Sequence, residues 1–118
     1  MKTAAKKVFD EMNGFPEYAR YVSSDEWRRC RTRFLRTSDR VRRMVKKYHR
    51  IICEFCHSDS KFNLHHKTYK RLGKERATDL IILCDHCHQT VHDLAKKVGI
   101  ESATRHVRKA FLARKGRF

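Results

Sequence analysis

Long apolar runs, glycine and proline are all scarce in this sequence. The 118 residues include one proline and four glycines, and they contain no repeat, low-complexity segment or flexible linker. No apolar stretch is long enough to cross a membrane, and none near the N-terminus has the character of a signal peptide. We therefore expect one domain, 1–118, in an intracellular, cytoplasmic setting and not in a membrane.

Acidic residues are also few. The chain has 13 Asp and Glu against 29 Lys and Arg, which gives a formal net charge of +16. So large a positive charge on a small domain favours a polyanionic partner, and nucleic acid is the common one. A merely solvated surface is the less specific alternative. No segment pairs the basic residues with a broad apolar face, which argues against a membrane-surface role.

Cysteine is present in an odd number, which argues against a fully disulfide-bonded secreted domain. Four of the five cysteines form two C-x-x-C pairs, Cys53/Cys56 and Cys84/Cys87, and Cys30 is left over. Two such pairs are typical of four thiolates around one tetrahedral zinc ion, and a four-cysteine site has no open position for substrate. We expect a structural Zn²⁺ here, with disulfides or a redox C-x-x-C as the alternatives.

Hydrophobic periodicity predicts helices over the basic N-terminal region, 1–48. A short helix is expected over 2–13, and a turn follows at 13–16. A capping box of Ser23 and Glu26 predicts a second helix that runs to about Tyr48, in preference to two helices broken at 37–39. Its apolar seam is expected to pack against the metal-binding core and not to form a coiled-coil dimer.

The remainder of the chain divides into a zinc-containing core, 49–98, and a basic C-terminal helix, 99–118. Within the core, alternation predicts short strands over 61–65 and 79–83, and a helical pattern follows over 85–98. Gly99 is expected to end that helix, and a last helix is expected over 101–115. The fold class expected is α+β and mainly helical, with helices flanking the zinc-containing core on both sides in sequence.

Three histidines have the spacing of a second metal site. His88 and His92 are four residues apart on a predicted helix, so they share one face, and His65 ends a strand that can run beside it. Three imidazoles leave a position open for water or phosphate, as a catalytic metal requires. The alternative is that His88 and His92 are ordinary surface residues.

His66 is expected on the other side of that strand, because neighbouring strand residues alternate in direction. A neutral imidazole is suited to accept a proton near neutral pH. Asp79, at the start of the second predicted strand, is placed to orient the His66 ring.

The pattern from His65 to His92 resembles that of the HNH endonucleases, which have the ββα-metal fold. It comprises H-H, an acid followed by L-x-x-L-C-x-x-C-H, and a final histidine four residues later. The likeness is strongest to the small phage and prophage type that carries an added four-cysteine zinc, and it covers about residues 49–95. The family usually has Asn where this chain has Asp79, and either side chain can accept a hydrogen bond from His66.

This resemblance implies roles for the residues named above. His65, His88 and His92 would bind a catalytic divalent metal (Mg²⁺, Mn²⁺, Zn²⁺ or Ni²⁺), His66 would be the general base, and Asp79 would orient it. The implied activity is hydrolysis of DNA phosphodiester bonds, most simply nicking of duplex DNA with little sequence preference. The rival interpretations are a non-catalytic zinc module that binds nucleic acid and an accessory domain that binds phage packaging proteins.

Overall fold

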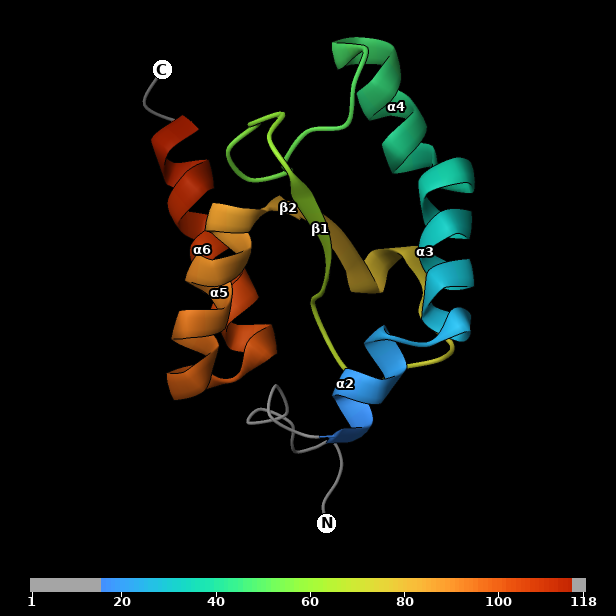
Figure 1. Ribbon diagram of the computed structural model, residues 1–118. Coiled ribbons are helices and arrows are strands. Elements are labelled where there is room, and N and C mark those ends of the chain that lie inside the picture. Colours follow the sequence, from blue (N-terminus) through green and yellow to red (C-terminus); the bar gives the residue numbers. More distant parts are fainter. Residues whose placement is uncertain (1–15, 116–118) are drawn as a thin grey trace.

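The computed structural model describes residues 16–115, and it is mostly helical with one two-stranded antiparallel sheet (Figure 1). This confirms the α+β class. The predicted helix over 2–13 lies outside the described residues. In chain order the elements are α2 (Pro16–Val22), α3 (Asp25–Thr37), α4 (Asp39–Tyr48), β1 (Phe62–His66), the 3-10 turn η1 (Ala77–Asp79), β2 (Leu80–Cys84), α5 (Asp85–Val98) and α6 (Ile100–Lys115).

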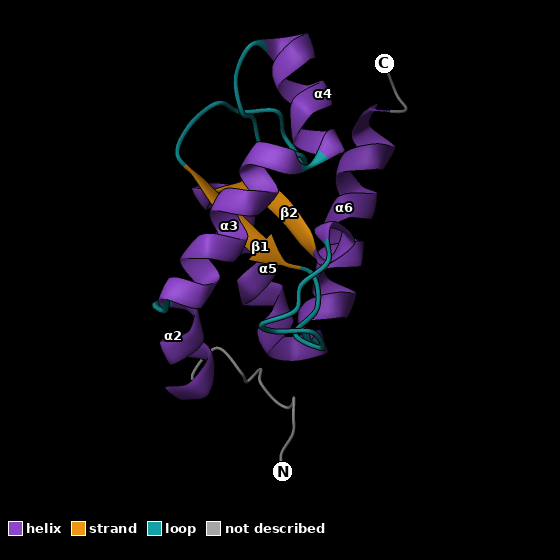
Figure 2. Cartoon of the chain, turned by 90° about the vertical axis from the view of Figure 1, so that its right-hand side faces the viewer, coloured by secondary structure: helices purple, strands orange, loops and turns teal. Residues whose placement is uncertain are grey.

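The sheet lies between two helical layers, α3 with α4 on one side and α5 with α6 on the other (Figures 1 and 2). All five residues of β2 are buried because both of its faces are covered. Leu80 and Ile82 pack in the core on the α3 side, whereas Ile81 and Leu83 pack in the core on the α5 side. An unbroken apolar strand between two helical layers follows from this arrangement.

The register of the sheet assigns the two adjacent histidines of β1 to different layers. His65 is opposite Ile81 and His66 is opposite Leu80. Because directly opposite residues share a face of an antiparallel sheet, His65 lies on the α5 side and His66 on the α3 side. The alternation predicted for this pair is therefore what the structure has.

The apolar seam of α3 and α4 is part of the core. Trp27, Cys30, Phe34 and Val41 are buried with Leu64, Leu80 and Ile82, and Met44 and Ile51 pack against them. The seam thus packs against β1 and β2, as predicted for the central part of the chain.

The single long helix predicted from Ser23 to Tyr48 is wrong. Ser38 has extended backbone angles, φ −69° and ψ 129°, and it ends α3 and begins α4. Its N–H still bonds to Phe34 O at 3.0 Å, and Arg42 N bonds to its carbonyl at 3.0 Å. The break at Ser38 has no side-chain cap. The sequence therefore contains no second capping box from which the break could have been predicted. The first cap is Ser24 and not Ser23, since the Ser24 Oγ accepts from Trp27 N at 3.1 Å.

The core elements lie close to their predicted places. Both strands begin and end one residue later than predicted, and α5 has the predicted bounds. Gly99 ends α5 with φ 86°, in the left-handed region that favours glycine. Neither α2 nor η1 was predicted from the sequence.

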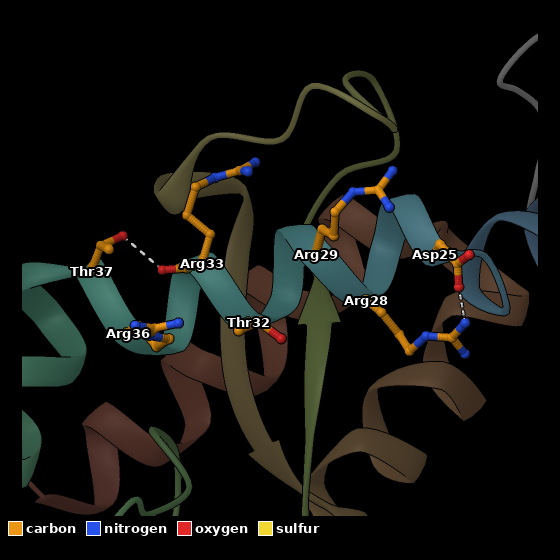
Figure 3. Close-up of a pocket in the computed structure, with 7 residues that line it drawn as sticks. All are labelled: Asp25, Arg28, Arg29, Thr32, Arg33, Arg36 and Thr37. Carbon is orange, nitrogen blue, oxygen red and sulfur yellow. Dashed lines mark hydrogen bonds and ion pairs between the residues drawn. The ribbon is translucent and has the colours of Figure 1, made fainter.

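The outer face of α3 carries a row of arginines. Arg28, Arg29, Arg33 and Arg36 line a shallow surface pocket together with Asp25, Thr32 and Thr37 (Figure 3). Of these arginines, Arg28 forms an ion pair with Asp25. This face is the strongly basic surface that the composition led us to expect.

No helix in the span from residue 16 to residue 115 combines the length and apolar character needed to cross a lipid bilayer.

Candidate functional site

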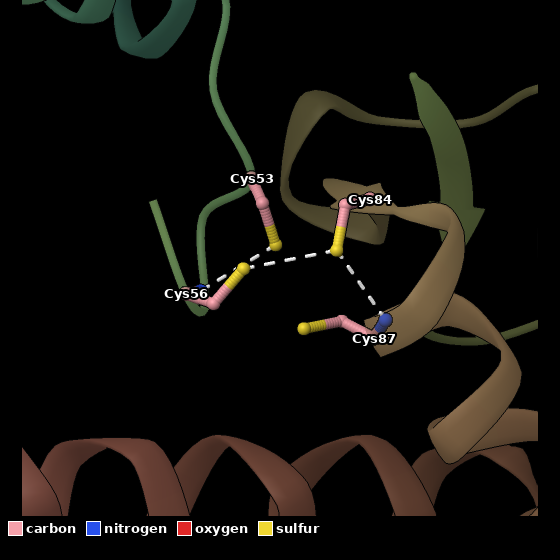
Figure 4. Close-up of side chains that lie close together, drawn as sticks. All are labelled: Cys53, Cys56, Cys84 and Cys87. Carbon is pink, nitrogen blue, oxygen red and sulfur yellow. Dashed lines mark hydrogen bonds between the residues drawn. The ribbon is translucent and has the colours of Figure 1, made fainter. Parts of the chain in front are cut away.

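The four cysteines of the two C-x-x-C pairs converge on one point. Their sulfur atoms all lie within 4.8 Å of one another, and all five cysteines of the chain are free of disulfides (Figure 4). Cys56 Sγ lies 3.7 Å from Cys84 Sγ. Zn–S bonds of about 2.3 Å in a tetrahedron give a sulfur separation of about 3.8 Å. The cluster is therefore compatible with a structural metal ion.

Backbone N–H groups already point at these sulfurs. Cys56 N lies 3.5 Å from Cys53 Sγ, and Cys87 N lies 3.4 Å from Cys84 Sγ. Such N–H groups stabilise thiolates. Burial nevertheless raises the pKa of the Cys87 thiol, and the neighbouring Cys53 raises it further. Without a cation the buried Cys87 thiol resists ionisation, and a divalent ion would supply the compensating charge.

A half-buried ion pair joins the first cysteine pair to the rest of the fold. Arg40 Nε donates to Glu54 Oε1 at 2.8 Å, and Ile82 N donates to Glu54 Oε2 at 2.8 Å. Glu54 N in turn donates to Ile82 O at 2.8 Å. These contacts connect α4, the loop of Cys53 and Cys56, and β2, so the loop is held where its sulfurs meet Cys84 and Cys87.

The three predicted histidine ligands are likewise brought together. His65 from β1 and His88 and His92 from α5 each offer a ring nitrogen within 4.8 Å of the others. The Nε2 atoms of His88 and His92 are 3.0 Å apart. Two nitrogens on one tetrahedral zinc ion lie about 3.3 Å apart, so the donor atoms fit a metal.

The hydrogen bonds of His65 leave one of its ring nitrogens free to bind a metal. Thr104 Oγ1 donates to Ile100 O at 2.7 Å, so it accepts from His65 Nε2 at 3.0 Å. The proton is then on Nε2, and Nδ1 has a lone pair. Among the described residues, Nδ1 of His65 is buried without any hydrogen-bond partner. A buried nitrogen left in this way is unfavourable unless something binds it, and a metal ion would do so.

Burial keeps the three imidazoles neutral. It lowers the pKa of His65 well below its ordinary value, and His88 and His92 lower it further. Burial also lowers the pKa of His88, and burial with the neighbouring His88 lowers the pKa of His92 to about 4. Neutral imidazoles are the form that binds metals, so the ligand set is ready near neutral pH.

His66 lies against α3 and the loop that follows β1. Its ring centroid is 4.6 Å from that of Trp27, and its Nε2 is 2.8 Å from Glu75 Oε2. His66 also lines a pocket that has His88 and His92 in its wall. His66 thus shares a pocket with His88 and His92, which form a cluster with His65 on the other face of the sheet.

The expectation that Asp79 orients His66 is wrong. Asp79 Oδ2 accepts from Arg71 Nε at 2.8 Å and from Arg76 N at 2.9 Å. The hydrogen bond from Arg71 is the main cause of the lowered pKa of Asp79. The reason is that Asp79 lies in η1, before β2 begins, where its carboxylate is engaged by Arg71 and by the backbone of Arg76. The carboxylate that contacts His66 is Glu75.

Three further residues of the site were not identified from the sequence. Glu75 and Thr104 hold the rings of His66 and His65, and Arg31 lines the same pocket as His66. Thr104 is 39 positions from His65, and Glu75 lies nine positions after His66 in an irregular loop, so no spacing rule connects either residue to its histidine. Arg31 was one of many α3 cations, and only the helix packing selects it.

Comparison with protein families, with curated proteins and with solved structures finds no match to this chain.

Proposed function

We propose that this protein is a metal-dependent DNA endonuclease of the HNH type, which nicks duplex DNA with little sequence preference. One observation carries the proposal. His65, His88 and His92 offer nitrogens within 4.8 Å of one another, and His66 lines the same pocket as His88 and His92. A purely structural ion would not require a further histidine, such as His66, beside its ligands.

The order of the elements supports a ββα-metal core. β1, β2 and α5 follow one another, and the histidine cluster draws its members from β1 and α5. The four cysteines lie in the loop after α4 and at the junction of β2 with α5. This is the arrangement that the resemblance implies, with a structural Zn²⁺ beside a catalytic divalent metal.

His65, His88 and His92 would hold the catalytic ion, His65 through Nδ1. A bound Mg²⁺, Mn²⁺, Zn²⁺ or Ni²⁺ supplies a Lewis acid that polarises the phosphate and stabilises the leaving 3′ oxygen. His66 accepts a proton from water, and the resulting hydroxide attacks phosphorus. The products of such a cleavage are a 5′-phosphate and a 3′-hydroxyl.

Arg31 is the cation best placed to bind the phosphate. It lines the pocket of His66, His88 and His92, and its guanidinium lies 5.5 Å from the centroid of the Phe62 ring. No ion pair engages Arg31 within the described residues. Arginine suits phosphate because its planar fork can donate two hydrogen bonds at once.

The basic outer face of α3 supports DNA as the partner. Lysine and arginine contacts to phosphates supply affinity and carry no sequence information, so the proposed cleavage is loosely selective and salt-sensitive. An intracellular, cytoplasmic site of action fits this partner and also keeps free thiols reduced. The alternative is a non-catalytic zinc-containing module that binds nucleic acid or phage packaging proteins, and it leaves the histidine cluster without a role.

The test is cleavage of supercoiled plasmid by the zinc-loaded protein with Mg²⁺, Mn²⁺, Zn²⁺ or Ni²⁺ added in turn. We expect nicked circles with at least one of these ions and loss of nicking in His66→Ala and His88→Ala. The matched control is His86→Ala, because His86 is an exposed histidine of α5 outside the ligand cluster. Retained zinc content in each variant shows that folding is intact. Equal cleavage by His66→Ala and the wild type would refute the assignment of the base.

A further inference from the structure

Glu75 is a completely buried carboxylate at the centre of several hydrogen bonds. Its side chain has 0% exposure, and that of His66 has 1%. Tyr21 Oη lies 2.8 Å from Oε1 and 2.7 Å from Oε2 of Glu75, and Gly73 N donates to Oε1 at 3.1 Å. Cys30 Sγ lies 3.6 Å from Oε1. A buried acid with this many donors around it is held in one orientation.

These donors keep Glu75 ionised. Burial alone would raise the pKa of Glu75, but hydrogen bonds from His66 and Tyr21 hold it below its ordinary value. An ionised carboxylate can only accept hydrogen bonds. The proton shared at 2.8 Å between His66 and Glu75 therefore belongs to Nε2 of His66. The other nitrogen, Nδ1, then has a lone pair, and no hydrogen bond to it is found in residues 16–115.

Aromatic rings fix the plane of the His66 imidazole. The Trp27 ring is 4.6 Å away and tilted by 35°, and the rings of Tyr18 and Tyr21 are 6.0 and 6.4 Å away. With the plane and Nε2 both fixed, the position of Nδ1 is fixed as well. His66 lines the pocket of His88 and His92, so Nδ1 is the atom available to that pocket.

We propose that Glu75 is the positioning residue of the proposed nuclease, and that it makes Nδ1 of His66 the atom that accepts the proton from water. The inference rests on the proposed function. In the reaction, an O–H bond of water breaks and its proton passes to Nδ1, while the freed electron pair forms the new P–O bond. The bond from phosphorus to the 3′ oxygen breaks, and that oxygen keeps the pair and takes a proton from solvent. The buried carboxylate stabilises the imidazolium that forms beside it.

Two measurements on the zinc-loaded protein test this role. The first is ¹⁵N NMR of the histidine rings, which reports which nitrogen carries the proton without requiring any nuclease activity. We expect His66 to be protonated at Nε2 and unprotonated at Nδ1. In Glu75→Gln the amide can donate as well as accept, so the Nε2-protonated population should fall. A wild-type ring protonated at Nδ1 would overturn the proposal.

The second measurement is plasmid nicking at saturating and limiting DNA. We expect Glu75→Gln to lower kcat by about 100-fold or more with KM nearly unchanged, since general bases contribute about 10²–10⁴-fold. Tyr21→Phe removes one hydrogen bond to Glu75 and leaves the His66 contact, so its kcat should fall less than tenfold. Asp59→Asn, which neutralises an exposed acid paired with Arg50, is the matched control.

Failure of the proposed nuclease function and failure of the positioning role of Glu75 give different results. A wild-type protein that does not nick under any ion defeats the proposed function, while NMR still measures the tautomer. An active wild type whose Glu75→Gln variant keeps full kcat defeats the positioning role alone.

Discussion

Thr104 Oγ1 lies 3.0 Å from Nε2 of His65 and donates its own proton to Ile100 O. Thr104, a residue of α6, thereby determines which ring nitrogen of His65 is available to bind a metal ion. The hydrogen bond is buried, since Thr104 has 3% exposure and His65 has 1%. The metal affinity of the histidine cluster should therefore depend on a residue that is not itself a ligand.

Replacing Thr104 with Val should weaken the histidine site. The change keeps the side-chain shape but removes the acceptor of His65 Nε2, so the ring loses its fixed tautomer. We expect the affinity for added Co²⁺ to fall by about 10–100-fold, with the zinc content of the cysteine cluster unchanged. Titration of the zinc-loaded protein with Co²⁺ measures this directly. Thr90→Val on α5, an exposed threonine, is the control, and an equal loss in both variants would contradict the account.

Replacing Cys87 with Ser should remove the structural metal. Three thiolates bind zinc less tightly than four, and the buried sulfurs would lose their compensating charge. We expect zinc content to fall and the melting temperature to drop, and an added chelator should have the same effect on the wild type. Elemental analysis and thermal unfolding report both quantities. Cys30→Ala should keep the zinc, because Cys30 lies in the core on the α3 side. Full zinc content in Cys87→Ser would be evidence against the four-cysteine site.

Stability should decline as the pH falls below the ordinary histidine pKa of about 6.5. In the folded chain burial lowers the pKa of His92 to about 4, so the unfolded chain takes up a proton that the folded chain rejects. The free energy of unfolding is therefore highest above pH 6.5 and is lost progressively toward pH 4, with a slope for one group of about 1 kcal/mol per pH unit.

Denaturant unfolding at pH 7.5, 6.5 and 5.5, with no second metal added, measures that slope. His92→Gln should show a smaller decrease than the wild type, because Gln does not titrate. Zinc release at the cysteines contributes equally to both proteins and cancels in the comparison. Identical slopes would show that His92 is not the group responsible.

Arg31 and Arg36 offer a matched pair on one helix. Both are arginines of α3, but Arg31 lines the histidine pocket and Arg36 lies on the basic outer face (Figure 3). We expect Arg31→Ala to reduce the nicking rate at saturating DNA by tenfold or more, because a phosphate contact beside the reacting centre is lost. Arg36→Ala should keep that rate and weaken binding only, lowering the salt slope of binding by about 1. Equal effects of the two changes on the saturated rate would remove the special role of Arg31.

The candidate metal ligands could be predicted from the sequence because local spacing rules place them. The spacing of Cys53 with Cys56, and of His88 with His92, fixes geometry within a single turn or helix, and strand alternation separates His65 from His66. Such local rules do not depend on how distant segments pack. The helix break at Ser38 lacked a side-chain cap, and so the local pattern did not reveal it.

The contacts that hold the rings of His65 and His66 could not be predicted by such local rules. Glu75 meets His66 from the loop after β1, and Thr104 meets His65 from α6 across 39 positions of chain. The choice between Glu75 and Asp79 as the partner of His66 depends on the course of that loop and on Arg71, which engages Asp79 instead. Only the packed structure contains this information.

The proposed function requires that the imidazoles hold an ion separate from the one among the sulfurs. Anomalous diffraction from crystals of the zinc-loaded protein soaked in Mn²⁺ tests it most directly. We expect a zinc peak among Cys53, Cys56, Cys84 and Cys87, and a manganese peak bounded by Nδ1 of His65 and the rings of His88 and His92. A single peak at the cysteines, with the three imidazoles turned apart and no density between them, would contradict it.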